Sequence, residues 1–159
     1  MTMLYVSDGS GFREAGAEAI LIRAHKLNFA ALSKRFASSV GRSQDRGVLD
    51  LHLGSKDYEV PGLLHLNTGH RLIAVEDLFR GTLDGASVHT REVLKSVLAH
   101  GSANVILYHN HPSGHAHPSE ADISVTDRLR AALKLIDMKV LDHLVVGEDV
   151  YSFSNAGRL

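Results

Sequence analysis

Runs of apolar residues in the second half of the chain predict strands that alternate with helices. A mostly apolar run at 60–66 and another at 71–79 flank turn residues at 67–70, which indicates an antiparallel hairpin. Pro61 should then lie at an edge or a bulge, because proline cannot donate a ladder hydrogen bond. A continuous apolar run is typical of a buried central strand, which we expect over 104–109.

Two helices and a second hairpin complete this pattern. Apolar residues recur at helical spacing over 91–100, where Thr90 is the expected N-cap, and again over 119–136. Runs at 140–146 and 150–153 predict a final hairpin. The expected fold class is therefore α/β, with a mixed, largely antiparallel sheet flanked by helices.

The first part of the chain has a different pattern. In chain order we expect irregular structure at 1–12, a helix at 13–37, a polar linker at 38–44 and a short helix at 45–54. The linker divides a helical N-terminal segment at 1–44 from the main domain at 45–159.

Composition restricts the chemistry. The chain has 159 residues, of which 44% are hydrophobic, and this is enough for one buried core. It contains no cysteine, so disulfides, thiolate metal sites and cysteine nucleophiles are excluded. Its first residues lack a signal-peptide pattern and no apolar run approaches the length of a membrane span. We therefore expect a cytoplasmic protein without membrane association.

Charge gives a weaker indication. The formal net charge of −1 provides no overall field that would attract nucleic acid. Positive charge is nevertheless concentrated in residues 13–46, where seven Lys and Arg side chains stand against three Asp and Glu. A solvated helix surface is the ordinary explanation for such a segment. The alternative is weak association with an acidic partner such as DNA.

The residues that carry chemistry begin at the carboxyl end of the predicted central strand. His109 and His111 are two positions apart, so on a strand their imidazoles project from one face and can reach the same ion. Asp122 follows in the first turn of the next predicted helix. Two histidines and a carboxylate leave the fourth tetrahedral position of zinc open for water, as in catalytic zinc sites. The sequence therefore predicts a Zn²⁺ site.

A hydrolytic zinc site also needs a base. A carboxylate must take a proton from the zinc-bound water and pass it to the leaving group. Glu59 and Glu76 each lie at the end of a strand in the first predicted hairpin, and the residues alone do not choose between them. Glu92 and Glu120 are weaker candidates at the starts of the two helices.

Several of these polar residues also have structural explanations. Ser119 and Asp122 match a capping box, in which both side chains satisfy free amides at a helix start. His115 and His117 repeat the His-x-His pattern, and we interpret them as loop residues that could capture adventitious metal.

Three further positions have competing roles. His143 follows Asp142 on a late strand, and we interpret the two as a hydrogen-bonded structural pair. The alternative is that His143 orients a metal ligand. His89 and Arg91 are interpreted as structural, with orientation of a loop or binding of a substrate carboxylate as the alternative.

Taken together, these motifs resemble a known family. His109-x-His111-Pro112-Ser113-Gly114, with ten residues between His111 and Asp122 and a glutamate at an earlier strand, is similar to the JAMM (MPN+) metalloprotease signature. Other segments resemble its RadC-like branch: Glu59, Leu66-Asn67, Gly81-Thr82, His89-x-Arg91-Glu92 and Leu141-Asp142-His143-Leu144-Val145-Val146-Gly147. The resemblance covers residues 45–159 and implies a short form without the helix-hairpin-helix region of longer members.

The resemblance implies a role for each matching position. The implied zinc ligands are His109, His111 and Asp122. Glu59 would be the general base in preference to Glu76, and Ser119 would help to stabilise the tetrahedral oxyanion. The implied fold is JAMM/MPN-like, with an architecture similar to that of cytidine deaminases. The implied activity is hydrolysis of peptide or isopeptide bonds in a peptide or protein substrate.

The chain departs from the RadC-like pattern at four positions, none of them a ligand: Pro61, His65, Thr90 and Tyr108. Pro61 and Tyr108 could reshape the cleft, so substrate choice transfers less readily than metal binding. The leading expectation is a zinc-dependent metallopeptidase or isopeptidase. The alternative is a DNA-associated accessory protein with a structural or vestigial metal site, because RadC-like proteins are associated by name with DNA repair.

Overall fold

The structure is a computed structural model that describes residues 5–7, 12–14, 53, 56–78 and 88–159. Near the N-terminus, strands β1 (Tyr5–Ser7) and β2 (Phe12–Glu14) pair antiparallel. The expectation of irregular structure up to residue 12 and of a helix from residue 13 is therefore wrong at these positions. Three-residue strands are too short to show an alternating pattern, which explains the error.

Several predictions for the first part of the chain lie outside the described residues. These are the rest of the helix at 13–37, the linker at 38–44, the helix at 45–54 apart from Leu53, and the boundary between the two segments. The basic residues from Arg23 to Arg46 lie there too. Association with DNA thus stays a prediction from sequence.

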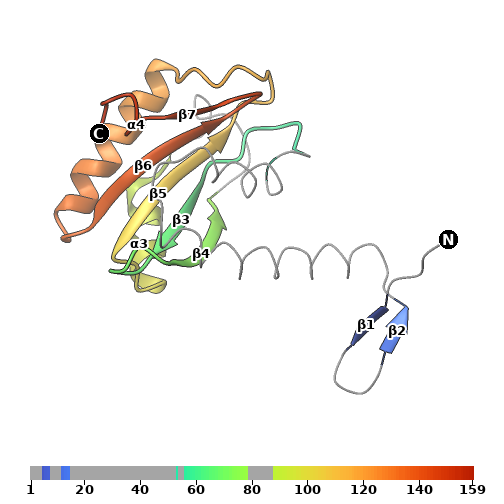
Figure 1. The fold of residues 1–159 in the computed structure, drawn as a ribbon. Coiled ribbons are helices and arrows are strands. Elements are labelled where there is room, and N and C mark those ends of the chain that lie inside the picture. Colours follow the sequence, from blue (N-terminus) through green and yellow to red (C-terminus); the bar gives the residue numbers. More distant parts are fainter. Residues whose placement is uncertain (1–4, 8–11, 15–52, 54–55, 79–87) are drawn as a thin grey trace.

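Over residues 56–78 and 88–159, the main domain contains a five-stranded sheet and two helices (Figure 1). In chain order the elements are β3 (Gly62–Leu66), β4 (Leu72–Asp77), α3 (Thr90–Ala99), β5 (Asn104–Asn110), α4 (Glu120–Lys134), β6 (Lys139–Val146) and β7 (Val150–Ser152). The strand order is β4-β3-β5-β6-β7, with β5 and β6 parallel and the other neighbours antiparallel. The predicted α/β fold with a mixed, largely antiparallel sheet is confirmed.

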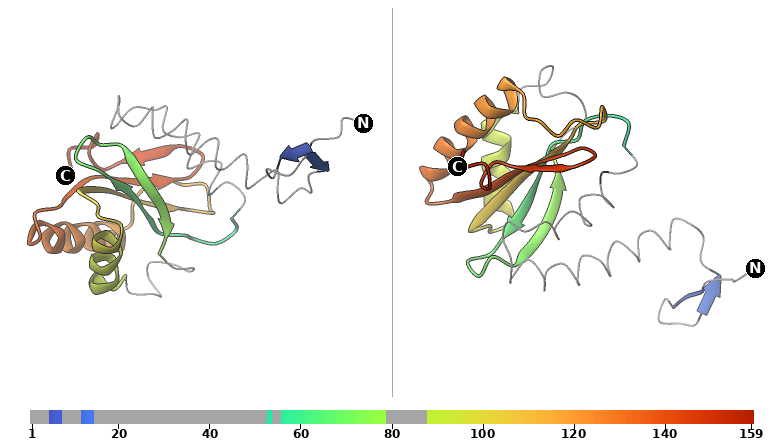
Figure 2. Two further views of the ribbon diagram at one scale, coloured as in Figure 1. Left: turned by 90° about the horizontal axis from the view of Figure 1, so that it is seen from below. Right: turned by 45° about the horizontal axis from the view of Figure 1, so that its top comes forward.

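Both helices cover the same face of the sheet, as the left view of Figure 2 shows. The core on that face contains Leu63, Val88, Val93, Val97, Val105, Leu107, Leu129, Leu133 and Met138. The core on the other face contains Leu53, Val60, Leu64, Leu66, Leu72, Ile106, Tyr108, Leu144 and Val146. Because strand residues alternate, His109 shares the helix-covered face with Val105 and Leu107. No helix among the described residues is long and apolar enough to cross a bilayer.

Element ends differ from the predictions in three places. Pro61 precedes β3, which lies inside the sheet, and the irregularity in its pairing with β4 falls between His65 and Leu66. His89, not Thr90, is the N-cap of α3, and its side chain makes no capping hydrogen bond. Helix α4 ends at Lys134, before the predicted end at 136.

Gly62 provides the space that Tyr108 occupies. The two residues are partners in the β3–β5 register, and a Cβ on Gly62 would overlap the Tyr108 ring and the carbonyl oxygen of Glu76. Tyr108 is buried, and its hydroxyl donates to Asp77 Oδ1 at 2.7 Å. The absence of a side chain at Gly62 therefore makes room for the large Tyr108 ring on the neighbouring strand.

Gly62→Ala should destabilise the domain by about 1–3 kcal/mol, because the added methyl group overpacks a buried contact. Urea unfolding followed by circular dichroism would measure this loss. Gly69→Ala is a matched control, since a Cβ there would meet only Asn67 Oδ1, at 3.4 Å. Equal stability losses in the two variants would contradict the packing argument.

Candidate metal centre

Three metal-ligating side chains meet at the carboxyl end of β5. His109 is the penultimate residue of the strand, His111 follows its end, and Asp122 lies in the first turn of α4. The Nε2 atoms of the two histidines are 3.0 Å apart. His109 Nε2 lies 3.2 Å from Asp122 Oδ1, and His111 Nε2 lies 3.6 Å from Asp122 Oδ2. The structure thus brings together the three predicted ligands.

The spacing of these atoms suits a small tetrahedral ion. Ligand atoms about 2.0–2.1 Å from zinc, at tetrahedral angles, lie about 3.4 Å from one another. The three observed separations of 3.0, 3.2 and 3.6 Å bracket that value. Two imidazoles and a carboxylate are also a donor set used by zinc and neighbouring divalent transition metals. The residues present therefore fit a metal ion.

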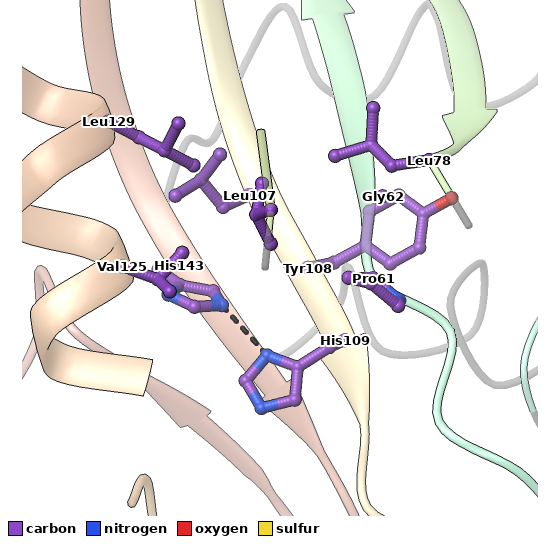
Figure 3. Close-up of a pocket in the computed structure, with 10 residues that line it drawn as sticks. Pro61, Gly62, Leu78, Leu107, Tyr108, His109, Val125, Leu129 and His143 are labelled. Atoms are coloured by element: carbon purple, nitrogen blue, oxygen red, sulfur yellow. Dashed lines mark hydrogen bonds between the residues drawn. The ribbon is translucent and has the colours of Figure 1, made fainter. Parts of the chain in front are cut away.

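A chain of hydrogen bonds leads from His109 back to the main chain of Asp122. His109 Nδ1 lies 2.8 Å from His143 Nε2 (Figure 3), and His143 Nδ1 lies 2.6 Å from Thr126 Oγ1. The Thr126 hydroxyl donates to the carbonyl of Asp122 at 2.6 Å. Because that carbonyl can only accept, Thr126 Oγ1 must in turn accept the proton on His143 Nδ1.

These bonds determine which ring nitrogen of each histidine carries the proton. A neutral His143 with its proton on Nδ1 has a lone pair on Nε2, so His109 donates from its own Nδ1. His111 likewise donates from Nδ1 to the main-chain carbonyl of His115 at 2.7 Å. The Nε2 lone pairs of His109 and His111 therefore both face the Asp122 carboxylate. Three electron-pair donors so close together favour a cation between them.

Burial and neighbouring charges set the protonation of His143, Asp122 and His111. Burial lowers the pKa of His143 well below its ordinary value, and nearby His109 lowers it further, so His143 is neutral. Burial alone would raise the pKa of Asp122, but the close contacts with the His109 and His111 rings hold that pKa well below its usual range. The facing Asp122 carboxylate raises the pKa of His111, which favours a proton on its Nε2 when no metal is bound. A proton and a metal ion thus compete for His111 Nε2.

Apolar side chains surround the contact between His109 and His143. A cavity of about 20 Å³, room for about one water, lies beside His109 and His143 and is lined by Leu107 and Leu129 (Figure 3). The His143 ring also stacks on Phe153, with ring centroids 4.8 Å apart. This packing explains the desolvation that keeps His143 neutral.

The prediction that His143 and Asp142 form a structural pair is wrong for the His143 side chain. Asp142 instead accepts hydrogen bonds from the main-chain amides of His143 and Ser154 and from the Ser152 hydroxyl. It thereby joins β6 to the residues that end and follow β7. The His143 ring contacts His109, as the alternative interpretation required.

Ser119 begins α4 with the predicted capping box. Its side-chain oxygen accepts from the Asp122 amide at 3.2 Å, and the Asp122 carboxylate accepts from the Ser119 amide at 2.7 Å. The Ser119 hydroxyl also donates to Asp122 Oδ2 at 2.7 Å. Ser119 therefore orients the carboxylate that faces the histidines, and its oxyanion role stays a prediction.

Asn110, between the two histidines, holds the segment that carries Glu59. Its side-chain oxygen accepts from the Val60 amide at 2.7 Å, and its side-chain amide donates to the Tyr58 carbonyl at 3.0 Å. These bonds fix the main chain on both sides of Glu59, whose charge is a further cause of the raised pKa of His111. The structure thus places Glu59 within electrostatic reach of the centre, while its role as general base stays a prediction.

The other glutamates that were considered as bases have different surroundings. Glu76 contacts His65 Nε2 at 3.1 Å in a separate cluster. Glu92 forms an exposed ion pair with Arg91 at 3.2 Å, which supports the structural interpretation of Arg91. Glu120 is exposed at the first residue of α4.

His115 and His117 lie in the loop between β5 and α4, as predicted, and both are exposed. The His117 ring meets Tyr151 edge-on, with centroids 5.6 Å apart. His115 reaches the centre through its main-chain carbonyl, which accepts from His111.

Sequence reasoning missed Thr126 and Asn110. Thr126 lies four residues after Asp122 and hence on the same face of α4, so helical spacing offered a usable signal. Asn110 stood inside the motif, but the amide that it binds, on Val60, is 50 residues away in sequence. Spacing within the motif gives no sign of such a contact.

His143→Leu should weaken metal binding by about 10–100-fold, because the Nδ1 proton of His109 would lose the partner that fixes its tautomer. Competition with a chromophoric chelator would measure the affinity. Thr126→Val should act in the same direction and less strongly, since it removes only the acceptor for His143. His117→Asn, in the exposed loop, should bind metal as the wild type does. Wild-type affinity in both His143→Leu and Thr126→Val would contradict the positioning role.

Most of this chain, including the candidate metal centre, is similar in sequence to known proteins. Residues 42–158 match the family model of the RadC-like JAB domain. A UPF0758 protein of Janthinobacterium sp. (strain Marseille) is 55% identical over 138 residues, which are 84% of this chain and 62% of that protein. UPF0758 proteins of Thioalkalivibrio sulfidiphilus and Nitrosococcus oceani are 54% and 57% identical, over 72% and 64% of this chain and 51% and 46% of theirs.

The chain thus spans between 46% and 62% of the length of these curated relatives. The family match nevertheless covers most of this sequence, including the segment from Glu59 to Asp122 that contains the candidate metal centre. The chain therefore belongs to the RadC-like JAB domain family.

Proposed function

We propose that this domain is a zinc-dependent metallopeptidase that hydrolyses peptide or isopeptide bonds. The observation that supports this most is the hydrogen-bond chain that leaves two imidazole lone pairs facing one carboxylate. A cation between these groups compensates their burial, as a proton does when no metal is bound. Three protein ligands also leave one tetrahedral position open, as in catalytic zinc sites.

Each residue near the centre has a part in the proposed reaction. Bound zinc supplies Lewis acidity, which polarises the scissile carbonyl and acidifies water. Glu59 accepts a proton from the attacking water and returns it to the leaving nitrogen, so it ends the cycle as a carboxylate. Asn110 holds the main chain around Glu59. The Ser119 hydroxyl, which donates to Asp122 Oδ2 in the free protein, is proposed to turn its proton to the developing oxyanion.

A groove of about 350 Å³ next to His111 offers space for the substrate. Asn110 and His111 line it together with Gly114, Gly147 and Glu148. The Glu148 amide donates to the Gly114 carbonyl at 2.8 Å, and Gly147 lies so close to Gly114 that a Cβ there would overlap it. The β6–β7 turn and the loop after His111 thus form one continuous wall, along which we propose that an extended peptide binds.

Removing the metal should abolish the proposed activity, and adding it back should restore the activity. Purified protein is expected to hold about one zinc per chain at this centre and to cleave members of a fluorogenic library of peptides and lysine-linked isopeptides. Treatment with 1,10-phenanthroline should bring cleavage to background, and added Zn²⁺ should restore it. Cleavage that survives complete removal of the metal would contradict the proposal.

A further inference from the structure

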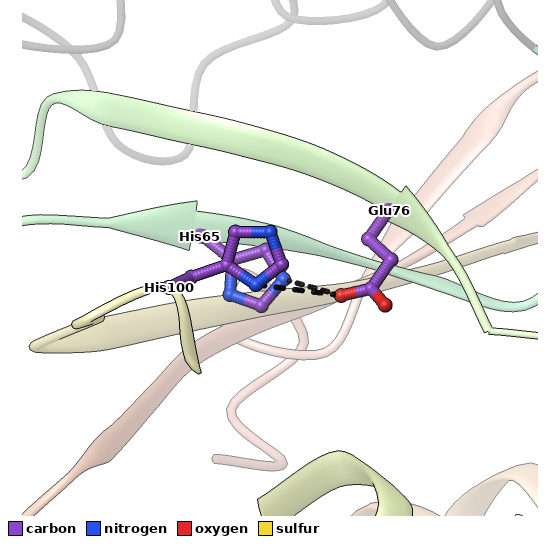
Figure 4. A group of neighbouring side chains, drawn as sticks. All are labelled: His65, Glu76 and His100. Carbon is purple, nitrogen blue, oxygen red and sulfur yellow. Dashed lines mark hydrogen bonds and ion pairs between the residues drawn. The ribbon is translucent and has the colours of Figure 1, made fainter. Parts of the chain in front are cut away.

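A second group of metal-ligating side chains lies at the opposite end of the central strands. It consists of His65 on β3, Glu76 on β4 and His100 just after α3 (Figure 4). His65 is opposite Val105 in the β3–β5 register, and His109 lies four residues further along β5. At about 3.3 Å per strand residue, the two groups are separated by about 13 Å along the sheet. They share no side chain.

His65 is an unusual residue for its place in the fold. It is 0% exposed and points to the helix-covered face. One ring nitrogen, Nδ1, lies 2.7 Å from Ser102 Oγ, and the other, Nε2, lies 3.1 Å from Glu76 Oε2. Burial, together with nearby His100, lowers the pKa of His65, so its imidazole is neutral near pH 7. A neutral imidazole can offer a lone pair to a metal ion.

His100 and Glu76 complete a convergent donor set. The His100 ring stacks on His65 with centroids 4.1 Å apart, and its Nδ1 lies 3.7 Å from the Glu76 oxygen that His65 contacts. The separations of 3.1 and 3.7 Å bracket the value of about 3.4 Å expected between ligand atoms around tetrahedral zinc. The side chains of Glu76 and His100 are 36% and 34% exposed, which gives an ion access from solvent.

We propose that His65, Glu76 and His100 form a second binding site, for a divalent transition metal ion of borderline softness such as Zn²⁺, Co²⁺ or Ni²⁺. Two imidazoles and one carboxylate select ions of this class over Mg²⁺ and Ca²⁺, which prefer oxygen ligands. The ion joins β3, β4 and the end of α3, so it stabilises the packing of that helix on the sheet. This inference is independent of the proposed peptidase activity.

Metal binding requires two local changes. The proton that His65 Nε2 donates to Glu76 must move to Nδ1, where Ser102 Oγ can accept it. His100 Nδ1 donates to the Ser96 carbonyl at 3.0 Å, and the Ser96 hydroxyl donates to Glu76 Oε2. His100 must exchange its hydrogen bond for the ion, which a partly exposed side chain beyond the helix end can do by rotating about its side-chain bonds. Ser96 can keep its bond, since a carboxylate has a second oxygen and further lone pairs.

Metal titration of the full chain tests the proposal, with ZnCl₂ as the probe. The starting protein is an Asp122→Asn, His115→Asn, His117→Asn variant, which weakens the first centre and removes the loop histidines. We expect one remaining Zn²⁺ equivalent by equilibrium dialysis, and ring ¹⁵N resonances of His65 and His100 that shift during the titration. Adding Glu76→Gln should abolish that equivalent. Adding Glu92→Gln, an exposed change on α3, should leave it intact.

His100→Asn provides a second test that spares the core, because His100 is partly exposed. It should lower the remaining affinity by at least tenfold while the circular dichroism spectrum is preserved. Zinc should also raise the melting temperature of the starting variant and lose that effect once Glu76→Gln or His100→Asn is added. Unchanged stoichiometry in Glu76→Gln and His100→Asn, with static His65 and His100 resonances, would overturn the proposal. Peptide cleavage by the wild type is a separate measurement, so failure here leaves the proposed function standing.

Discussion

Glu59→Gln should lower kcat/KM for peptide hydrolysis by about 10²–10⁴-fold, the usual contribution of a general base. Glutamine has nearly the same shape but cannot take a proton from the attacking water. Zinc content should stay at the wild-type level, because Glu59 is not among the three clustered ligands. The two hydrogen bonds of the Asn110 side chain should also be retained, since they bind the main chain of Val60 and Tyr58 and not the Glu59 side chain.

Glu120→Gln is the matched control for this change. Glu120 is also an acidic residue near the centre, two positions before Asp122, but it is exposed at the start of α4. It should keep both zinc and activity. Initial rates on the substrate found in the library screen, with zinc measured by mass spectrometry, decide the result. A Glu59→Gln protein that is fully active with its zinc in place would show that another group transfers the proton.

The sequence predicted the sheet well where burial imposes one pattern over many residues. Strand β5 is buried at every position and was recognisable as a continuous apolar run. The first hairpin was recognisable from its turn, where Asn67 Oδ1 accepts from the Gly69 and Arg71 amides. Strands β1 and β2, of three residues each, carried too little pattern to be distinguished from coil.

The clustering of the three candidate ligands was predictable because local geometry suffices to bring them close together. The i, i+2 spacing placed His109 and His111 together, and the capping pattern placed Asp122 at a helix start. The contacts of His143 were not predictable in this way. Its neighbour Asp142 was an available partner in sequence, but β6 pairs in parallel with β5 and thereby sets Leu107 opposite His143, two residues from His109. Only the sheet register reveals that contact.

The same limit applies to the second group of ligands. His65, Glu76 and His100 come from three separate elements, and no motif connects them. From sequence, His65 was only an interruption in an apolar strand, and Glu76 was a candidate base. The antiparallel register of β3 with β4 and the packing of α3 on the sheet place both beside His100.

Asp122→Asn should reduce zinc affinity by more than roughly 100-fold, the upper end of the effect of partners outside the ligand set. The change removes the negative charge that both His109 and His111 face. An asparagine side-chain oxygen can still accept from the Ser119 amide, so the start of α4 is retained. Chelator competition on a protein that also carries Glu76→Gln, which removes the proposed second site, should therefore show weak binding with near wild-type helix content. Tight binding of about one zinc by this double variant would exclude Asp122 as a ligand.

The Ser119→Ala variant distinguishes the effect of losing the helix cap from the effect of losing the proposed ligand Asp122. It removes the hydroxyl that caps α4 and donates to Asp122 Oδ2 but leaves the carboxylate in place, so it should cost about 1 kcal/mol of stability. Its zinc affinity should fall by less than that of Asp122→Asn. If Ser119 also stabilises the oxyanion, kcat should drop by about 10²–10³-fold with zinc still bound, and Ser119→Thr should restore it. A cap alone predicts lower stability with kcat unchanged, so unfolding and rate measurements on the same two variants distinguish the roles.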